Sequence, residues 1–311
     1  MNQIKHILVV VDPSVRGKQS AVDKTTILAR HVGASVELLI CDIASAIDDR
    51  VIPLHPHEAH PSNTRLLGIL DELATPARAA GVDVKTHLIY GNSLYDSLLD
   101  YIRGSTADLV VKDTHHHTFA KRTFWGNTDW HLARGCAVPL LLTKKQTWMQ
   151  PPIIMAAVDP THVNERAAAL DRHILYCAAS LAGHLRADLH VIHTFVPTAF
   201  ANAVVAGNVR MSPEYCEALQ VESTYRYYEI EHLVRPYGVS GEHLHVEMGT
   251  PQSGLMSTVT QHRTDIMVMG ASAHGRWHRT VVGSTAASVL ESLPCDFLIV
   301  RPSDEMQSVP L

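Results

Sequence analysis

Apolar and polar positions recur along the chain in two similar series, one in each half. Each series opens with a short apolar run that ends in Asp-Pro, at Asp12-Pro13 and again at Asp159-Pro160. Further runs predict strands at 36–40, 82–89, 109–112 and 140–142, and then at 189–193, 243–246, 266–269 and 297–300. Nearly continuous apolar runs of this length are typical of buried parallel strands.

Between the predicted strands, apolar residues return at helical spacing. One such helix is expected to end at Gly33, and its counterpart in the second half near Gly183. The helices are predicted from residues 21–32 and 170–181, and longer ones from 64–80 and 213–237. A third helix should follow the third strand of each half.

Strands that alternate with helices indicate an open parallel sheet covered on both faces. We therefore predict an α/β fold made of two tandem, doubly wound, parallel five-stranded sheets. The domains are expected at residues 1–145 and 151–304, because a repeat of half the chain is long enough for a complete small domain. The short linker, 143–152, predicts that the two domains pack closely.

Composition narrows the class of protein. The 311 residues carry a net charge of -5, which argues against a nucleic-acid surface. The first six residues run straight into a strand without a secretory signal, and no apolar run is long enough to span a membrane. The five scattered cysteines are typical of a reduced, cytoplasmic protein. A homodimer of the two-domain chain is compatible with this composition.

The loop after the fourth strand of the second half carries the most informative motif. Gly270, Ala273 and the pair Gly283-Ser284 follow the spacing G-x2-A-x9-G-S. The chain here resembles the universal stress protein family, whose nucleotide-binding members carry G-x2-G-x9-G-[ST]. Pro294-Cys295 precedes the last strand as in that family, and Asp159 matches its acidic residue facing the adenosine. The resemblance covers both halves and is nearest to tandem proteins of the E type.

The resemblance implies an adenine-nucleotide alpha-hydrolase-like fold, with the two domains packed as an internal pseudo-dimer. It also implies a role in stress-response signalling or survival, with ATP or another adenine nucleotide as the small-molecule ligand. The predicted binding residues are Asp159, Pro160, Gly270, Ala273, Gly275, Arg276, Gly283, Ser284 and Thr285.

The chemistry of these residues suits a phosphate. Glycine lets the backbone approach a ligand closely, and Gly283-Ser284 would open a helix whose free N–H groups favour an anion. Ser284 and Thr285 can cap that helix, and Arg276 can neutralise charge. The alternative is that Gly283-Ser284 is only a helix cap and Gly270 only a turn. Ala273 places a methyl group where the family has glycine.

The first half has lost this motif. At the same spacing it reads Asp113-x2-His116-x9-Gly126-Asn127, so a carboxylate stands where Gly270 stands in the second half. A negative charge there opposes a phosphate, and we expect no ATP in the first half although Asp12 is retained.

Histidine is unusually frequent, with 21 residues. His115 and His117 are candidate zinc ligands in the degenerate loop, because neutral imidazole is a common metal ligand. The alternative is that these are solvated loop histidines, since the spacing matches no closed zinc signature.

A second class of function is also open. The long apolar segment 195–211 could cover a pocket for an apolar, lipid-like ligand, or simply cover the sheet. Such a chain would be a non-nucleotide binding module that holds an apolar ligand, a metal ion or both. No nucleophile motif indicates an enzyme, and slow ATP hydrolysis is the most that the motifs allow.

Overall fold

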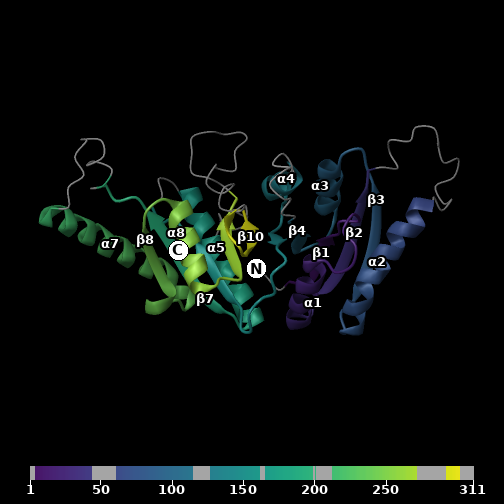
Figure 1. The fold of residues 1–311 in the computed structure, drawn as a ribbon, viewed down its shortest axis with the longest axis horizontal. Helices are drawn as coiled ribbons and strands as arrows, with labels where there is room; N and C mark the ends of the chain where they lie inside the picture. Colours follow the sequence, from purple (N-terminus) through teal and green to yellow (C-terminus); the bar gives the residue numbers. More distant parts are fainter. Residues whose placement is uncertain are drawn as a thin grey trace. The chain divides into compact units, whose positions relative to one another are not determined.

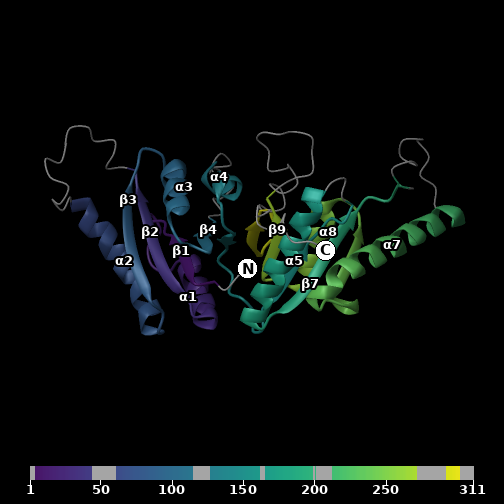
Figure 2. The same cartoon turned by 180° about the vertical axis from the view of Figure 1, so that it is seen from behind.

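The computed structural model describes residues 4–43, 61–114, 127–161, 165–198, 200, 212–271 and 292–301. Contacts divide the chain into two compact units. Unit 1 consists of Met1–Thr147 with Asp296–Ile299, and unit 2 of Trp148–Cys295 with Val300–Leu311. Both units combine a mainly parallel sheet with helices (Figures 1 and 2), which confirms the predicted α/β fold class.

Unit 1 contains strands and helices in strict alternation. Its elements are β1 (His6–Val10), α1 (Ser20–Val32), β2 (Ser35–Asp42), α2 (Pro61–Ala79), β3 (Val84–Tyr90), α3 (Leu94–Gly104), β4 (Leu109–Asp113), α4 (Asn127–Gly135) and β5 (Leu140–Thr143). The strand order is β3-β2-β1-β4-β5, and all of these neighbours run parallel. Helix α1 packs against α2, and α3 against α4. Right-handed crossovers place these two pairs on opposite faces of the sheet.

Unit 2 repeats this plan. Its elements are β6 (Ile153–Ala157), α5 (Glu165–Leu185), β7 (Asp188–Phe195), α7 (Pro213–Val234), the 3-10 turns η3 (Arg235–Tyr237) and η4 (Gly241–His243), β8 (Leu244–Met248), α8 (Pro251–His262) and β9 (Ile266–Gly270). The order β9-β6-β7-β8 is parallel throughout. In this unit α5 contacts β6, β7 and β9, whereas α7 contacts β8.

The strands form the cores of the units. Ile7, Leu8 and Val9 in β1 are fully buried, as are Ile154 and Met155 in β6. Helices cover both faces of each sheet, so consecutive strand residues are buried whichever way they point. This explains why the strands were recognisable as unbroken apolar runs.

Helix ends follow the local sequence. Helix α1 ends as predicted at Gly33, which adopts φ 72°. Helix α5 does not end at Gly183 but continues to Leu185, and Arg186 then adopts φ 52°. Gly183 therefore lies inside the helix, which ends near this glycine as predicted but two residues beyond it. At the start of α7, the Ser212 hydroxyl accepts a hydrogen bond from the Tyr215 N–H.

The last strand, β10 (Asp296–Val300), comes from the second half of the sequence. Its residues 296–299 belong to unit 1, where β10 pairs antiparallel with β5 and Phe297 lies opposite Leu142. Val300 belongs to unit 2, where its carbonyl accepts the Ala271 N–H at 2.9 Å. The domain limits 1–145 and 151–304 remain a prediction.

Candidate functional site

The strand order of unit 2 changes direction at β6. From β6 the chain continues through α5 to β7 on one side, and from β8 it crosses to β9 on the other. Ligands of open α/β sheets bind at this switch point, outside the carboxyl ends of the strands. Asp159 and Pro160 follow β6, and Gly270 is the last residue of β9. The fold therefore brings these three predicted site residues to one place.

The Asp159 carboxylate is held in a local turn. Its Oδ1 atom accepts hydrogen bonds from the Thr161 N–H at 3.1 Å and from the Thr161 hydroxyl at 2.5 Å. The Asp159 N–H donates to Asp171 Oδ2 at 3.1 Å, and Asp171 is buried. The Asp159 side chain is nevertheless 45% exposed. It is thus oriented by the protein and still accessible to a ligand.

A buried histidine lies beside this carboxylate. His193 Nδ1 is 3.1 Å from the Val158 carbonyl and 4.0 Å from Asp159 Oδ1. A carbonyl can only accept, so Nδ1 carries the proton. Burial lowers the pKa of His193 and keeps the ring neutral. Among the described residues Nε2 has no hydrogen-bond partner, so this nitrogen is a buried acceptor without a donor.

Packing explains why glycine ends β9. A Cβ atom at Gly270 would lie 2.6 Å from Leu170 Cδ2 and 3.0 Å from Leu170 Cγ. Any side chain at this position would therefore overlap with Leu170 of α5. This gives Gly270 a structural reason that does not depend on a phosphate, in addition to the functional reason expected from the motif.

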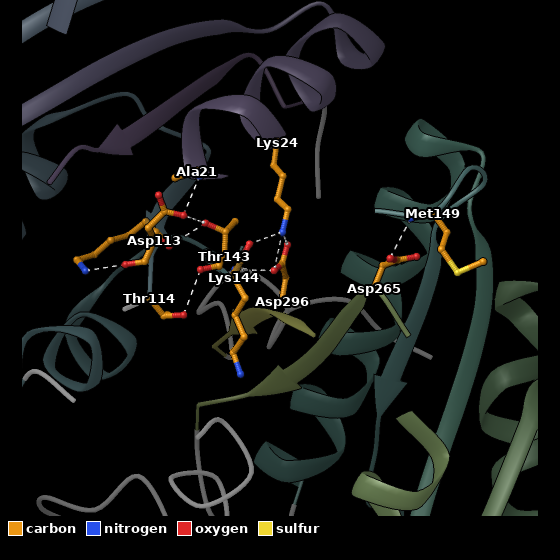
Figure 3. Close-up of polar contacts among 10 residues, drawn as sticks. Ala21, Lys24, Asp113, Thr114, Thr143, Lys144, Met149, Asp265 and Asp296 are labelled. Carbon is orange, nitrogen blue, oxygen red and sulfur yellow. Dashed lines mark hydrogen bonds and ion pairs between the residues drawn. The ribbon is translucent and has the colours of Figure 1, made fainter. Parts of the chain in front are cut away.

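Unit 1 fills the equivalent position with its own carboxylate. Asp113, the last residue of β4, is buried, and its Oδ1 accepts the Ala21 N–H at 2.8 Å and the Thr143 hydroxyl at 2.7 Å (Figure 3). Ala21 lies in the first turn of α1, so Asp113 satisfies a donor at the end of a helix where an anion would otherwise be favoured. The local contacts agree with the expectation that Asp113 opposes a phosphate.

In unit 1 a glutamine holds the backbone of Asp12. Gln19 is buried, its Oε1 accepts the Asp12 N–H at 3.1 Å, and its Nε2 donates to the Asp12 carbonyl at 2.8 Å. The Asp12 carboxylate accepts both the N–H and the hydroxyl of Ser14. This turn matches that of Asp159 with Thr161, so the difference between the units lies in Asp113, whose carboxylate is already hydrogen-bonded to Ala21 and Thr143.

The remaining predicted site residues lie outside the described residues. These are Ala273, Gly275, Arg276, Gly283, Ser284 and Thr285 for the nucleotide, and His115 and His117 for zinc. Sequence reasoning missed His193, which lies at the end of the predicted strand 189–193. Its only signal was a polar residue in a buried apolar run.

Comparison with known proteins identifies the family. The model of the universal stress protein family matches residues 3–144 and again 153–301. The chain belongs to the universal stress protein family. It carries two copies of the family's domain in tandem, which confirms the resemblance noted in the sequence.

Relatives match this chain over nearly the whole length of both proteins. Universal stress protein E of Escherichia coli K12 is 23% identical over 100% of this chain and 98% of its own. The universal stress protein E homolog of Haemophilus influenzae is 21% identical, covering 97% of this chain and 98% of its own. These matches support the E type.

Solved structures show the same fold. A functionally unknown protein of Pseudomonas aeruginosa PAO1 has a TM-score of 0.71 at 24% identity, covering 98% of this chain and 95% of its own. A universal stress protein of Archaeoglobus fulgidus has a TM-score of 0.65 at 16% identity, with 96% and 97% coverage. Among the described helices of this tandem universal stress protein, none is long and apolar enough to cross a membrane.

Proposed function

We propose that unit 2 binds an adenine nucleotide or a related phosphate ligand at the carboxyl ends of β6 and β9, and that the protein serves the stress response in the cytoplasm. The observation that carries this proposal is the Asp159 carboxylate, which is oriented by Thr161 and 45% exposed at the switch point. The family of the chain and the spacing of the following loop support it.

The proposed roles follow from the donors and acceptors present. Asp159 would accept hydrogen bonds from a hydroxyl group of the ligand, as a charged acceptor suited to a partly buried site. Gly283, Ser284 and Thr285 would offer N–H and hydroxyl donors to the phosphate, and Arg276 a positive charge. His193 places a neutral, buried ring beside this carboxylate, with its Nδ1 atom 4.0 Å from Asp159 Oδ1.

The contrast with unit 1 explains why we assign binding to one unit. At the end of β4, Asp113 accepts the Ala21 N–H and the Thr143 hydroxyl, so the carboxylate itself occupies the start of α1. The corresponding position in β9 is Gly270, which brings no charge. A phosphate near Asp113 would meet a negative charge, whereas one near Gly270 would not.

The test is titration calorimetry of the full chain with ATP and with AMP. Gly283→Asp should abolish nucleotide binding, because it puts a carboxylate at the proposed phosphate site. Gly126→Asp, the matched change in unit 1, should leave the affinity unchanged. Asp159→Asn should weaken binding at least about tenfold, since a hydrogen bond to a charged group is worth about 1.5–3 kcal/mol. Equal affinities in Gly283→Asp and Gly126→Asp would contradict the proposal.

A second candidate is a binding module for an apolar, lipid-like ligand. The position of Leu170 beside Gly270 favours it, because this buried apolar side chain accounts for the glycine by packing alone. Mass spectrometry of small molecules released from freshly purified protein distinguishes the two. Near-stoichiometric nucleotide supports the first candidate, and an acyl-chain compound without nucleotide supports the second.

A further inference from the structure

Four histidines gather at the amino ends of β7 and β8 in unit 2. His190 lies on β7, His243 in η4, His245 on β8, and His262 is the last residue of α8. The register of the two strands explains part of this cluster. Val191 pairs with Leu244 and Ile192 with His245, which brings the start of β7 beside the start of β8. Residues that are far apart in the sequence thus become neighbours.

The ring nitrogens of three of these histidines converge. One nitrogen each of His190, His245 and His262 lies within 4.8 Å of the other two. His190 Nδ1 is 2.9 Å from His245 Nε2, and the ring centroids of His245 and His262 are 4.3 Å apart. The His243 ring stacks at a tilt on His190, with centroids 4.4 Å apart. Among the described residues, this is the one group placed to hold a metal ion.

We propose that His190, His245 and His262 form a binding site for a divalent transition-metal ion, with zinc as the best match, through one ring nitrogen each. Imidazole nitrogen binds zinc at about 2.0–2.1 Å, and ligands at tetrahedral angles then lie about 3.3 Å apart. The His190 Nδ1 and His245 Nε2 atoms are 2.9 Å apart, and one nitrogen of each of the three histidines lies within 4.8 Å of the others. The expected separation of about 3.3 Å falls between these two distances. Three protein ligands leave the fourth position to water.

The protonation state suits a metal ion. Burial, reinforced by the neighbouring histidines, lowers the pKa of both His190 and His245 to about 4. Both rings are therefore neutral at physiological pH. Each offers a nitrogen lone pair to a metal ion without first having to lose a proton. The hydrogen bond between His190 and His245 would be exchanged for two metal bonds.

The surroundings also favour a cation. His262 lies at the carboxyl end of α8, where the helix dipole is negative. The Asp188 carboxylate lies close enough to His190 to raise its pKa, against the dominant effect of burial. His190 is buried, His245 and His262 are half-buried, and His243 is exposed, so the cluster opens to solvent on the His243 side.

This site is separate from the proposed nucleotide site. Asp159 and Gly270 lie at the carboxyl ends of their strands, whereas His190 and His245 lie near the amino ends of theirs. The two sites share no residue, and the zinc site predicted at His115 and His117 is different again. A variant that fails to bind metal therefore does not test the proposed nucleotide site, and a variant that fails to bind nucleotide does not test the metal site.

The test compares metal binding by the full chain and by single variants, after chelator treatment and dialysis. His245→Gln and His262→Gln each remove one ligand, and His232→Gln changes an exposed histidine of α7 as the matched control. Zinc titration calorimetry gives the number of sites, so that other histidines of the chain are counted separately. Cobalt provides a second readout, because a tetrahedral Co²⁺ site has a strong visible absorption.

The expected result is that His245→Gln and His262→Gln each bind one zinc equivalent fewer than the wild type, or bind it at least about tenfold more weakly. Both should lose the cobalt absorption, which His232→Gln should retain. Thermal unfolding without metal, with midpoints near that of the wild type, shows that the variants are folded. Zinc should then raise the midpoint of the wild type more than that of either variant. Identical zinc stoichiometry, affinity and cobalt spectra in all four proteins would overturn the proposal.

Discussion

Lys24 and Asp296 form a buried ion pair although they lie 272 residues apart in the sequence. Lys24 Nζ is 2.6 Å from Asp296 Oδ2, and the two side chains are 5% and 0% exposed (Figure 3). Backbone groups complete the network. Lys24 donates to the Lys144 carbonyl at 2.8 Å, and Asp296 Oδ1 accepts the Lys144 N–H at 2.7 Å. All three residues belong to unit 1, so this network ties β10 to α1 and to the end of β5.

Breaking this pair should be costly. Asp296→Ala leaves the Lys24 ammonium buried without its carboxylate, and we expect the free energy of unfolding to fall by about 3–5 kcal/mol. Equilibrium denaturation of the full chain measures the loss. The matched control is Asp71→Ala, which breaks the exposed pair of Asp71 with Arg78 and should cost no more than about 1 kcal/mol. Equal losses in the two variants would show that burial of the pair does not matter.

The Asp113 carboxylate should contribute to stability rather than to ligand binding. Asp113→Ala removes the acceptor of the Ala21 N–H and the Thr143 hydroxyl, and should lower the free energy of unfolding by about 1–3 kcal/mol. Nucleotide affinity should stay unchanged, because the proposed site is in unit 2. Asp100→Ala, at an exposed position of α3, serves as the control. A variant that gained or lost nucleotide binding would contradict this assignment.

The contact of Leu170 with Gly270 predicts a specific non-additivity. Gly270→Ala inserts a methyl group 2.6 Å from Leu170 Cδ2, and this overpacking should cost about 1–3 kcal/mol. Adding Leu170→Ala should recover part of that loss, so the double variant should be more stable than the sum of the single effects. Gly183→Ala is the control. It lies inside α5 with nothing within 4 Å of a new Cβ atom, and should stabilise the protein by about 0.5–1 kcal/mol.

The histidine cluster predicts a pH dependence of the metal-free protein. The folded pKa values of His190 and His245 are about 4, below their ordinary value of 6.5, because of burial and of neighbouring histidines. Between pH 6.5 and 4 the unfolded chain therefore binds more protons than the folded chain. The contribution to stability should be full above pH 6.5, should fall between pH 6.5 and about 4, and should level off below the folded pKa values. His243 and His262 reinforce this effect, and Asp188 opposes it.

Denaturation in the presence of chelator at a series of pH values measures this dependence. His245→Gln removes one of the two groups, so the free energy of unfolding should fall less steeply with acid than in the wild type. His232→Gln should keep the wild-type slope, because this exposed side chain lies outside the cluster. Parallel curves for all three proteins would rule out the cluster as the source.

The sequence predicted the elements of the fold well, because their signal is local. The predicted strand at 109–112 corresponds to β4 (Leu109–Asp113), and the helix at 64–80 to α2 (Pro61–Ala79). Unbroken apolar runs identify strands whose two faces are both covered, and helical spacing identifies the covering helices. The residues after β6 and β9 could be placed at one site because parallel strands at a switch point end together.

Contacts that depend on the packing of distant segments could not be predicted. The convergence of His190 with His262 depends on the register of β7 with β8 and on the end of α8, none of which appears as a local spacing. One local signal existed, namely the alternation His243-x-His245 at the start of a strand, but this spacing alone does not identify the third ligand. The packing reason for a glycine at position 270 likewise depends on Leu170, a residue 100 positions earlier whose side chain lies where a Cβ atom of residue 270 would be.

The closed network around Gln19 and Asp113 has a practical consequence for experiments on this protein. Because unit 1 satisfies these groups with its own side chains, its melting should not respond to added nucleotide, whereas a ligand that binds folded unit 2 should delay the melting of that unit. A single calorimetric scan would then contain its own reference, in which one transition stays fixed while the other moves. Every nucleotide titration could be calibrated against a part of the same molecule.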